Sequence, residues 1–453
     1  MLFYLALFIT LFAIWGIALC LSDGSLMAPV LLALLGVSVS VFLAAVGWSS
    51  WNHVELQWES AMVVVVGSAS LLLGLLIAHC IIGTPRNRKC VVSNAKYDYL
   101  APYWKYLVVG FVLMVAIALR VAETYRIAED LGVNFTSYSS AAKAVRNELA
   151  GFMNSEGMKA GVGFSMLERQ FEKAAIVVGY VAAYMLARNI IRRDMGRGTA
   201  SAVLLILACV FCLAMGSRGT MMYYGIAFAT CLFICFVRSG RRPRTLALRF
   251  LVIGICACLL AGAFFYFSGS LIGREPGSGV VEYLSFYYGC GVPALQYVLD
   301  SGALPWVDPG IRTFYYLFSV PFKLGLIDSY PSYSIMWVDM GGHGCNIFTG
   351  FARYYLDFGL AGVVVLSALS GLLITLVFDR AQTYGHPLFV VFAGYLAAYA
   401  FDFAREEFIF SRLLSPTQFV SVAIMLAVTL FLTTSLREDV KRVKAFFSRK
   451  RLA

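Results

Sequence analysis

The chain has 453 residues, of which 60% are hydrophobic and only 13% are charged, whereas soluble domains carry about a quarter charged residues. This composition excludes a soluble globular protein and predicts an integral membrane protein. The net charge of +11 would indicate a nucleic-acid partner in a soluble protein. Here the basic residues fall largely in short loops between apolar runs, a pattern that reports membrane topology, so no nucleic-acid partner is expected.

Apolar runs of roughly 20 residues, long enough to cross about 30 Å of hydrocarbon, recur along the whole chain. The first run lacks a basic n-region and an A-x-A cleavage site, so we interpret it as a retained helix and not as a signal peptide. The expected fold class is all-α, a polytopic bundle formed by a single membrane-embedded domain, residues 1–453. We place about eleven spans, within a range of 10 to 12, at residues 2–20, 27–47, 61–83, 103–121, 172–190, 199–215, 220–237, 246–268, 354–378, 387–403 and 417–435.

The basic loops set the expected orientation. Alternation of the spans places the four clearest of them on one side: residues 86–89, 188–197, 238–244 and the basic tail, 436–453. The positive-inside rule makes that side the cytoplasm. We therefore expect a multi-pass protein of the cytoplasmic (inner) membrane, with the N-terminus outside and the C-terminus in the cytoplasm.

Two loops on the outer, periplasmic side are much longer than the rest, residues 123–172 and 269–353. The first contains SSAAKAVRNELAGFM, with apolar positions at intervals of three and four, which predicts a helix on the membrane surface or capping the bundle. The second is rich in glycine, proline and aromatic residues. Its apolar segments, such as residues 315–326, are too short to span, so we expect interfacial or re-entrant helices.

The eleven cysteines predict no metal site, because no C-x-x-C pair is accompanied by the histidines that zinc needs. Most of them lie within apolar runs, where a cysteine behaves as a small hydrophobic residue. Cys290 and Cys345 are the only cysteines in the two outer loops, and we predict a disulfide between them.

Arg218 lies in the short outer turn GSRGT between two apolar runs. A charge this close to hydrocarbon is costly, so Arg218 needs a partner or an anionic ligand. Gly216 and Gly219 let backbone approach closely, and the helix start at Thr220 offers free N–H groups, a combination that suits a phosphate or pyrophosphate. The alternative is an interfacial arginine that pairs with lipid headgroups or a loop carboxylate.

Three more arginines belong to the second outer loop: Arg274, Arg312 and Arg353. Arg274 follows the eighth span and could clamp an anion bidentately, although a plain surface arginine fits equally well. Several arginines facing one external cavity, with no nucleotide-binding motif in the chain, favour a substrate that carries its own phosphates.

The stretch from residue 342 to 372 concentrates polar chemistry before a glycine-punctuated apolar run. His343, one of only four histidines, could act as a general base, or it could be an exposed loop residue without a role. Asp357 could be the base instead, or hold Arg353 through an i, i−4 pair. We interpret the last outer turn, residues 405–412, chiefly as a structural ion cluster. The polar side chains of the opening stretch are His343, Asn346, Arg353, Tyr355 and Asp357.

At these residues the chain resembles the Wzy-type oligosaccharide repeat-unit polymerases, which are related to the O-antigen ligases. SRG at residues 217–219 is similar to a turn shared by both groups. The segment LSFYYGCGVPALQYVLD after Arg274, and the pattern N-x-[FY]-T followed by Y-x-D-F-G-x-x-G at residues 346–362, resemble the polymerases. The chain departs from the ligases in that two residues, Gly344 and Cys345, separate His343 from Asn346.

The resemblance implies a glycosyltransferase that moves a growing glycan from undecaprenyl pyrophosphate to an incoming lipid-linked repeat, without a metal, nucleotide or other cofactor. Arg218 would bind the donor pyrophosphate, with Arg274 as a second candidate, and the stretch from His343 to Asp357 would orient the acceptor sugar. Arg312 and Arg353 join the substrate-binding set with Asn346 and Tyr355. The implied partners are lipid-linked oligosaccharides, membrane lipids and a chain-length regulator.

Two alternatives stay open. An O-antigen ligase would deliver the glycan to a lipid A core, and a flippase or transporter would move the same lipid-linked intermediates across the membrane. A transporter is expected to carry charged residues deep within its spans. The middles of the spans here are nearly free of charge, which favours chemistry at one face.

Overall fold

The computed structural model describes residues 1–51, 54–83, 99–154, 163–240, 262–269, 279–302, 307–327, 338–340 and 343–434. It confirms an all-α polytopic fold. Ten of the described helices are long and apolar enough to cross a membrane: α1 (Leu2–Leu21), α2 (Pro29–Val46), α3 (Trp58–Ile82), α4 (Tyr103–Asp130), α6 (Met166–Arg192), α7 (Met195–Ala214), α8 (Arg218–Arg238), α14 (Gly350–Tyr384), α15 (Pro387–Phe401) and α16 (Pro416–Thr433). The predicted span 246–268 lies mostly outside the described residues, and 262–269 is helical.

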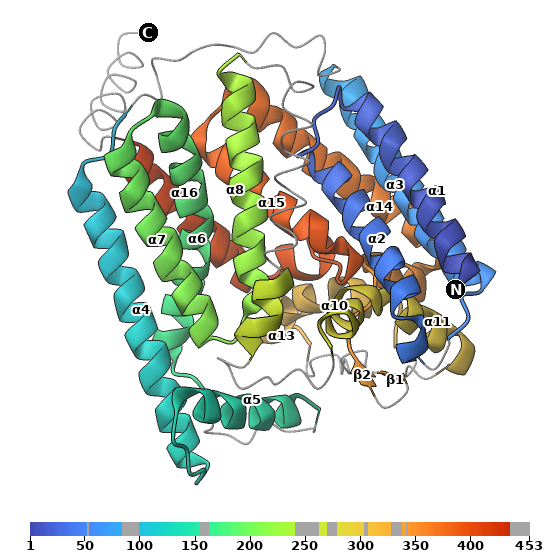
Figure 1. Ribbon diagram of the computed structural model, residues 1–453, viewed down its shortest axis with the longest axis horizontal. Helices are drawn as coiled ribbons and strands as arrows, with labels where there is room; N and C mark the ends of the chain where they lie inside the picture. Colours follow the sequence, from blue (N-terminus) through green and yellow to red (C-terminus); the bar gives the residue numbers. More distant parts are fainter. Residues whose placement is uncertain are drawn as a thin grey trace.

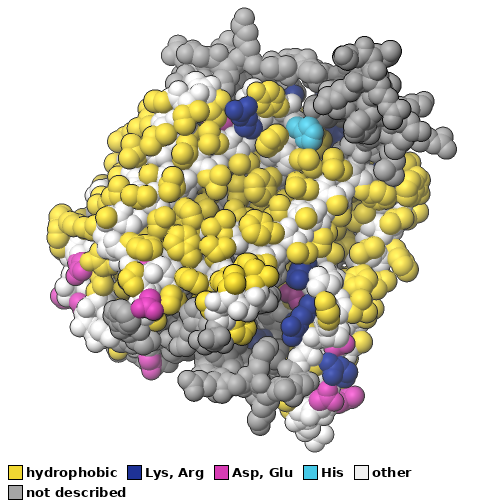
Figure 2. All heavy atoms as spheres, turned by 180° about the vertical axis from the view of Figure 1, so that it is seen from behind, with side chains coloured by type: hydrophobic (Ala, Val, Ile, Leu, Met, Phe, Trp, Pro, Cys, Tyr) yellow, Lys and Arg dark blue, Asp and Glu magenta, His cyan; other side chains and the backbone are white. Residues whose placement is uncertain are grey.

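These helices stand side by side in one bundle (Figure 1). The N-terminus, the crossing helix α5 (Tyr138–Asn154) and the short elements between α8 and α14 lie together at one end, which we call the loop end. Seen from behind, hydrophobic side chains cover the middle of this face of the bundle, and the charged side chains lie above and below them (Figure 2). This distribution is the one that a hydrocarbon layer requires.

The first outer loop is more helical than its sequence indicated. α4 continues to Asp130, well beyond the predicted end of its span. α5 then crosses the loop end, and its apolar positions Ala141 and Val145 pack against Ile127 and Ala128 of α4 in a small separate core. The apolar side of α5 therefore packs against another helix of the protein, α4.

The second outer loop folds into α10 (Val280–Gly289), α11 (Gly291–Ser301), α12 (Ile311–Phe314), a 3-10 helix (η4, Tyr315–Phe318) and α13 (Ser319–Lys323). A two-stranded antiparallel sheet follows, β1 (Val338–Met340) and β2 (His343–Cys345), with Val338 opposite Cys345. The short helices predicted for this loop are present, and the sheet is an additional element that the sequence analysis did not include. The sequence has two consecutive glycines between the strands, a pattern typical of a β-hairpin. The many aromatic and apolar residues around them favoured helices instead.

The predicted disulfide is also not formed. Cys290, between α10 and α11, and Cys345, at the end of β2, are both buried and both free thiols. The two side chains nevertheless lie against each other. Burial raises the pKa of the Cys290 thiol, whereas the hydrogen bond from Cys290 lowers the pKa of Cys345. The pair therefore joins β2 to the α10–α11 corner through packing and one S–H contact.

α3 and α14 approach closely because small residues face each other between them. A Cβ on Gly74 would lie 2.1 Å from the carbonyl oxygen of Ala368, and one on Gly371 would lie 2.3 Å from that of Leu71. Without a hydrophobic drive between helices in lipid, such close backbone packing is a main source of helix association. This contact fixes the helix that carries Arg353 and Asp357 at its loop end.

Replacing Gly74 by alanine should therefore destabilise the protein by about 3 kcal/mol, because the helices must separate to admit one methyl group. Thermal unfolding of the purified protein in detergent measures the change. Gly16→Ala is the matched control, since a Cβ there meets nothing within 4 Å. Equal melting temperatures for the two variants would contradict the packing argument.

Candidate functional site

Arg218 is the first residue of α8 and is only 2% exposed. Its Nη1 donates to the carbonyl oxygen of Phe265, and its Nη2 donates to the Tyr283 hydroxyl at 2.6 Å. The guanidinium also stacks 4.2 Å from the Phe265 ring centre. Its Nε is buried and makes no hydrogen bond within the described part of the chain. One donor of a buried guanidinium thus remains available, at a helix N-terminus whose free N–H groups also favour an anion.

α10 supplies an aromatic surface next to Arg218. The rings of Tyr283 and Tyr287 lie 4.8 Å apart, and Phe265 packs edge-on against Tyr287 at 5.3 Å. Burial raises the pKa of the Tyr283 phenol, which therefore stays neutral at physiological pH. The sequence showed that the loop was aromatic, but not that these rings gather around Arg218.

A second arginine, Arg405, lies beyond the same aromatic surface. Its guanidinium is 5.0 Å from the ring centre of Tyr288, and its Nη1 is 3.3 Å from Asp402. Tyr223 of α8 donates a hydrogen bond to the other oxygen of Asp402. Burial works against the charged form, but the carboxylate of Asp402 raises the pKa of Arg405, so this guanidinium stays charged. Like that of Arg218, its Nε is buried without a hydrogen bond among the described residues.

A third cluster joins α12 to the start of α14. Arg312 lies 3.6 Å from Asp357, and the backbone N–H of Thr313 donates to the same carboxylate at 2.7 Å. Arg353 donates to the carbonyl oxygen of Arg312 at 2.8 Å and lies 3.6 Å from Glu406. The sequence offered Arg353 as a partner of Asp357, whereas the described contacts of its carboxylate are with Arg312 and Thr313. Asp357 instead fixes α12 against α14, because α12 packs on the face of the helix that carries it.

The turn 405–412 completes this cluster. Arg412 pairs with Glu406 at 2.9 Å, next to the contact between Glu406 and Arg353. Glu407 is fully buried and accepts hydrogen bonds from the Tyr354 hydroxyl and from the N–H groups of Phe410 and Ser411. The turn is thus built around a carboxyl group, and it presents arginines on either side of it.

Burial raises the pKa of the Glu407 carboxyl despite these donors. A carboxyl whose pKa is raised on folding contributes stability below its ordinary pKa and loses that contribution as the pH rises through the folded-state value. We expect the melting temperature to fall as the pH rises from about 4.5, and Glu407→Gln to reduce this fall. Thermal unfolding across that pH range measures both. Glu282→Gln, at an exposed position of α10, should keep the wild-type profile, and an identical profile for Glu407→Gln would contradict the assignment.

The glycines of the D-F-G-x-x-G pattern have a structural role. Gly359 adopts φ +63°, a left-handed conformation that interrupts α14 two residues after Asp357. A Cβ on Gly362 would lie 2.8 Å from the carbonyl oxygen of Tyr354. The kink therefore separates a short polar segment at the loop end from the apolar span that follows it.

The remaining sequence-predicted residues are placed as follows. Asn346 is exposed between β2 and α14, and Tyr355 donates a hydrogen bond to Glu59 at the start of α3. The backbone of His343 lies in β2, but the structure does not describe its side chain. Arg274 lies outside the described residues. Arg405 was not among the candidate binding residues predicted from the sequence. Asp402, three residues earlier at the end of a span, could have indicated that Arg405 is a paired charge near the site.

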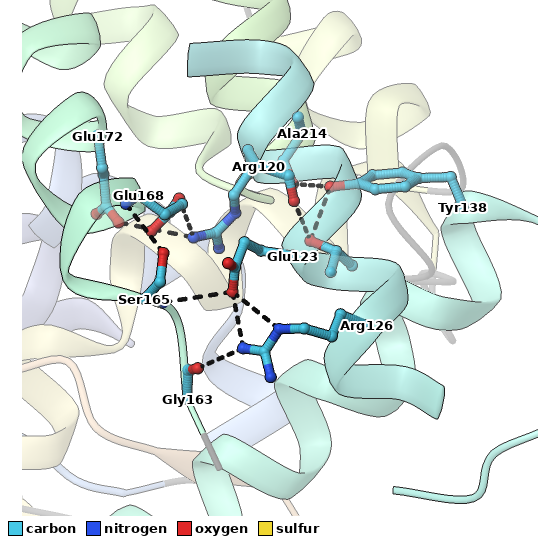
Figure 3. A network of polar contacts seen from close by, with 10 residues as sticks. Arg120, Glu123, Arg126, Tyr138, Gly163, Ser165, Glu168, Glu172 and Ala214 are labelled. Atoms are coloured by element: carbon cyan, nitrogen blue, oxygen red, sulfur yellow. Dashed lines mark hydrogen bonds and ion pairs between the residues drawn. The ribbon is translucent and has the colours of Figure 1, made fainter. Parts of the chain in front are cut away.

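The α4–α5 region supports the turn that precedes Arg218 (Figure 3). Arg120 of α4 pairs with Glu168 at 3.0 Å and with Glu172 at 3.6 Å, both on α6. One turn further along α4, the Thr124 hydroxyl lies 3.5 Å from that of Tyr138, which donates to the carbonyl oxygen of Ala214. Ala214 ends α7, four residues before Arg218, so this network positions the α7–α8 turn.

Together the three clusters place five arginines and four carboxylates at the loop end: Arg218, Arg312, Arg353, Arg405, Arg412, Asp357, Asp402, Glu406 and Glu407. The arrangement can bind an anion beside an aromatic surface. No group of three or more metal-ligating side chains occurs among the described residues. No protein-family model, curated protein or solved structure matches the chain.

Proposed function

We propose that this protein is a membrane glycosyltransferase that polymerises undecaprenyl-pyrophosphate-linked oligosaccharides at the loop end, and that this end faces the periplasm, as the positive-inside rule predicts. The observation that carries the proposal is Arg218. Its guanidinium is buried at the start of a membrane helix beside the Phe265 ring, and its Nε makes no hydrogen bond among the described residues. Burying such a group is costly unless an anion compensates it. A lipid pyrophosphate brings its anion to this depth.

The chemistry needs a hydroxyl of the acceptor sugar to attack the anomeric carbon of the donor. The new C–O bond forms as the bond to pyrophosphate breaks, the electron pair leaves with the phosphate oxygen, and the hydroxyl proton passes to a base. Buried guanidinium groups would stabilise the developing charge on the leaving group, the kind of preorganised effect that contributes most to many enzymes. Arg218 takes this role, with Arg274 and Arg405 as further candidates.

The acceptor would lie near the polar start of α14. Asn346 is exposed just before this helix, and Arg353 and Tyr355 are half-buried in its first turns. Asp357 is engaged by Arg312 and the Thr313 N–H, which suits a positioning role better than proton transfer. His343 therefore remains the proposed base. His343→Ala should lose activity by at least about 100-fold, and near-normal chain ladders would move the role elsewhere.

The decisive experiment incubates the purified protein with a lipid-linked repeat unit, in the presence of a chelator, and separates the products on a gel. A ladder of lengthening glycans supports a polymerase without a metal requirement. Transfer to a lipid A core without elongation would instead indicate a ligase. Translocation in vesicles without any new glycosidic bond would indicate a flippase, and either result contradicts the proposal.

A further inference from the structure

A cavity lies at the other end of the bundle, between helices that the proposed reaction does not use. Its volume is about 10 Å³, the room for the centre of one water-sized particle. It is formed where α1, α2, α3 and α14 meet, at the end opposite α5 and the hairpin (Figure 1). Its polar lining consists of Ser22, Ser25, His79, Thr375, Asp379 and Gln382.

Two hydroxyls at this cavity are buried without a hydrogen bond among the described residues. Ser22 and Ser25, in the turn between α1 and α2, are each only 2% exposed. A hydroxyl buried without a partner costs roughly 1–3 kcal/mol. Two such groups on the wall of one cavity therefore indicate that something polar fills it.

The lining is rich in oxygen and carries a carboxylate. Asp379 is 3% exposed and lies 3.9 Å from His79 Nε2. Thr375 donates its hydroxyl proton to the carbonyl oxygen of Gly371 at 2.7 Å, which leaves the oxygen able to accept or coordinate. Carboxylate, hydroxyl and carboxamide oxygens are the ligands of hard cations.

The surrounding helix ends favour positive charge. Ser22 follows the last residue of α1, and His79 and Gln382 lie in the last turns of α3 and α14. Three helices thus direct their C-terminal ends, which carry partial negative charge, toward the cavity, and only α2 directs its N-terminus there. An ionisable residue within a membrane bundle is itself an indication of function.

We infer that this cavity binds one monovalent alkali cation, held by Asp379 and the hydroxyls of Ser22 and Ser25. A divalent ion is disfavoured, because Ca²⁺ takes about six to eight oxygen ligands and Mg²⁺ keeps several waters, and one carboxylate in a water-sized space offers neither. The ion would join the α1–α2 turn to the end of α14. This inference does not depend on the proposed glycosyltransferase activity.

The test is thermal unfolding of the purified full-length protein in detergent at about pH 8, where an imidazole is ordinarily neutral. NaCl or KCl replaces choline chloride at constant ionic strength, up to about 200 mM. One of the two alkali salts should raise the melting temperature by about 2 °C or more over choline. The comparison of sodium with potassium identifies the ion.

The double variant Ser22→Ala/Ser25→Ala should lose this shift, while it keeps Asp379 and His79 in place. Ser68→Ala is the matched control, because Ser68 on α3 is also a fully buried serine without a hydrogen bond among the described residues, but it does not line the cavity. Ser68→Ala should keep the wild-type response. An equal melting temperature in all three salts, or a shift that survives the double variant, would show a water-filled cavity and overturn the inference.

Discussion

Arg218→Ala should abolish polymer formation while the protein still accumulates in the membrane. The guanidinium is 2% exposed, stacks on Phe265 and donates to Tyr283, so alanine removes a buried and positioned charge at the start of α8. Loss of one preorganised donor typically costs about 10²–10³ in rate. A glycan ladder assay on membranes, normalised to the amount of folded protein, measures the effect.

Arg218→Lys should recover little activity, because an ammonium is a point charge and cannot reproduce the bidentate fork. Arg126→Ala is the matched control, since Arg126 lies at the same end of the bundle but is 46% exposed and already paired with Glu123 and Asp130. Tyr283→Phe removes the hydroxyl that accepts from Arg218 and keeps the ring, so a partial loss is expected. Normal chain ladders in Arg218→Ala would exclude Arg218 from the site.

Asp357→Ala should destabilise the protein by about 3–5 kcal/mol, the usual cost of leaving one member of a buried ion pair alone. The side chain of Asp357 is fully buried, that of Arg312 is 9% exposed, and the same carboxylate accepts the Thr313 N–H. Removal of the carboxylate should therefore release α12 from α14 and also lower activity. Chemical or thermal unfolding in detergent measures the stability, and the ladder assay measures the function.

The exposed pair between Arg126 and Asp130 provides the control for this variant. Its N–O distance, 2.9 Å, is shorter than that of the buried pair, but its side chains are 46% and 52% exposed. Asp130→Ala should therefore cost less than about 1 kcal/mol. A double-mutant cycle of Arg312 and Asp357 should give a coupling energy of about 0.5–3 kcal/mol, and additive effects would count against the pair.

The positions of the spans could be predicted from the sequence, although some helices, such as α4, continue beyond the predicted ends. The predicted run 387–403 corresponds to α15, and 220–237 to α8. The physical reason is that hydrocarbon thickness imposes both a length and an apolar composition on each helix, and both can be read locally. Part of the candidate site could be predicted from the sequence for the same reason. An arginine in a very short turn between two spans, such as Arg218, must lie near the hydrocarbon.

The short elements of the second long loop were harder to predict from the sequence. β1 and β2 have three residues each, too few for an alternating pattern to be recognised. The close approach of α3 to α14 was equally hidden, because a glycine in an apolar run gives no indication of which helix it faces. Only the packed bundle shows that Gly74 and Gly371 lie at one contact.

The sequence by itself determined that this protein is a bundle of membrane helices with arginines, aromatic residues and a polar stretch gathered in its two long loops. The tertiary structure alone decided the partners: Asp357 with Arg312, Tyr223 with Asp402 at a separation of 179 residues, and Ser22 with Asp379 at one cavity. Span length and composition are local properties of a chain in lipid, whereas the partner of a buried charge depends on which helices pack together.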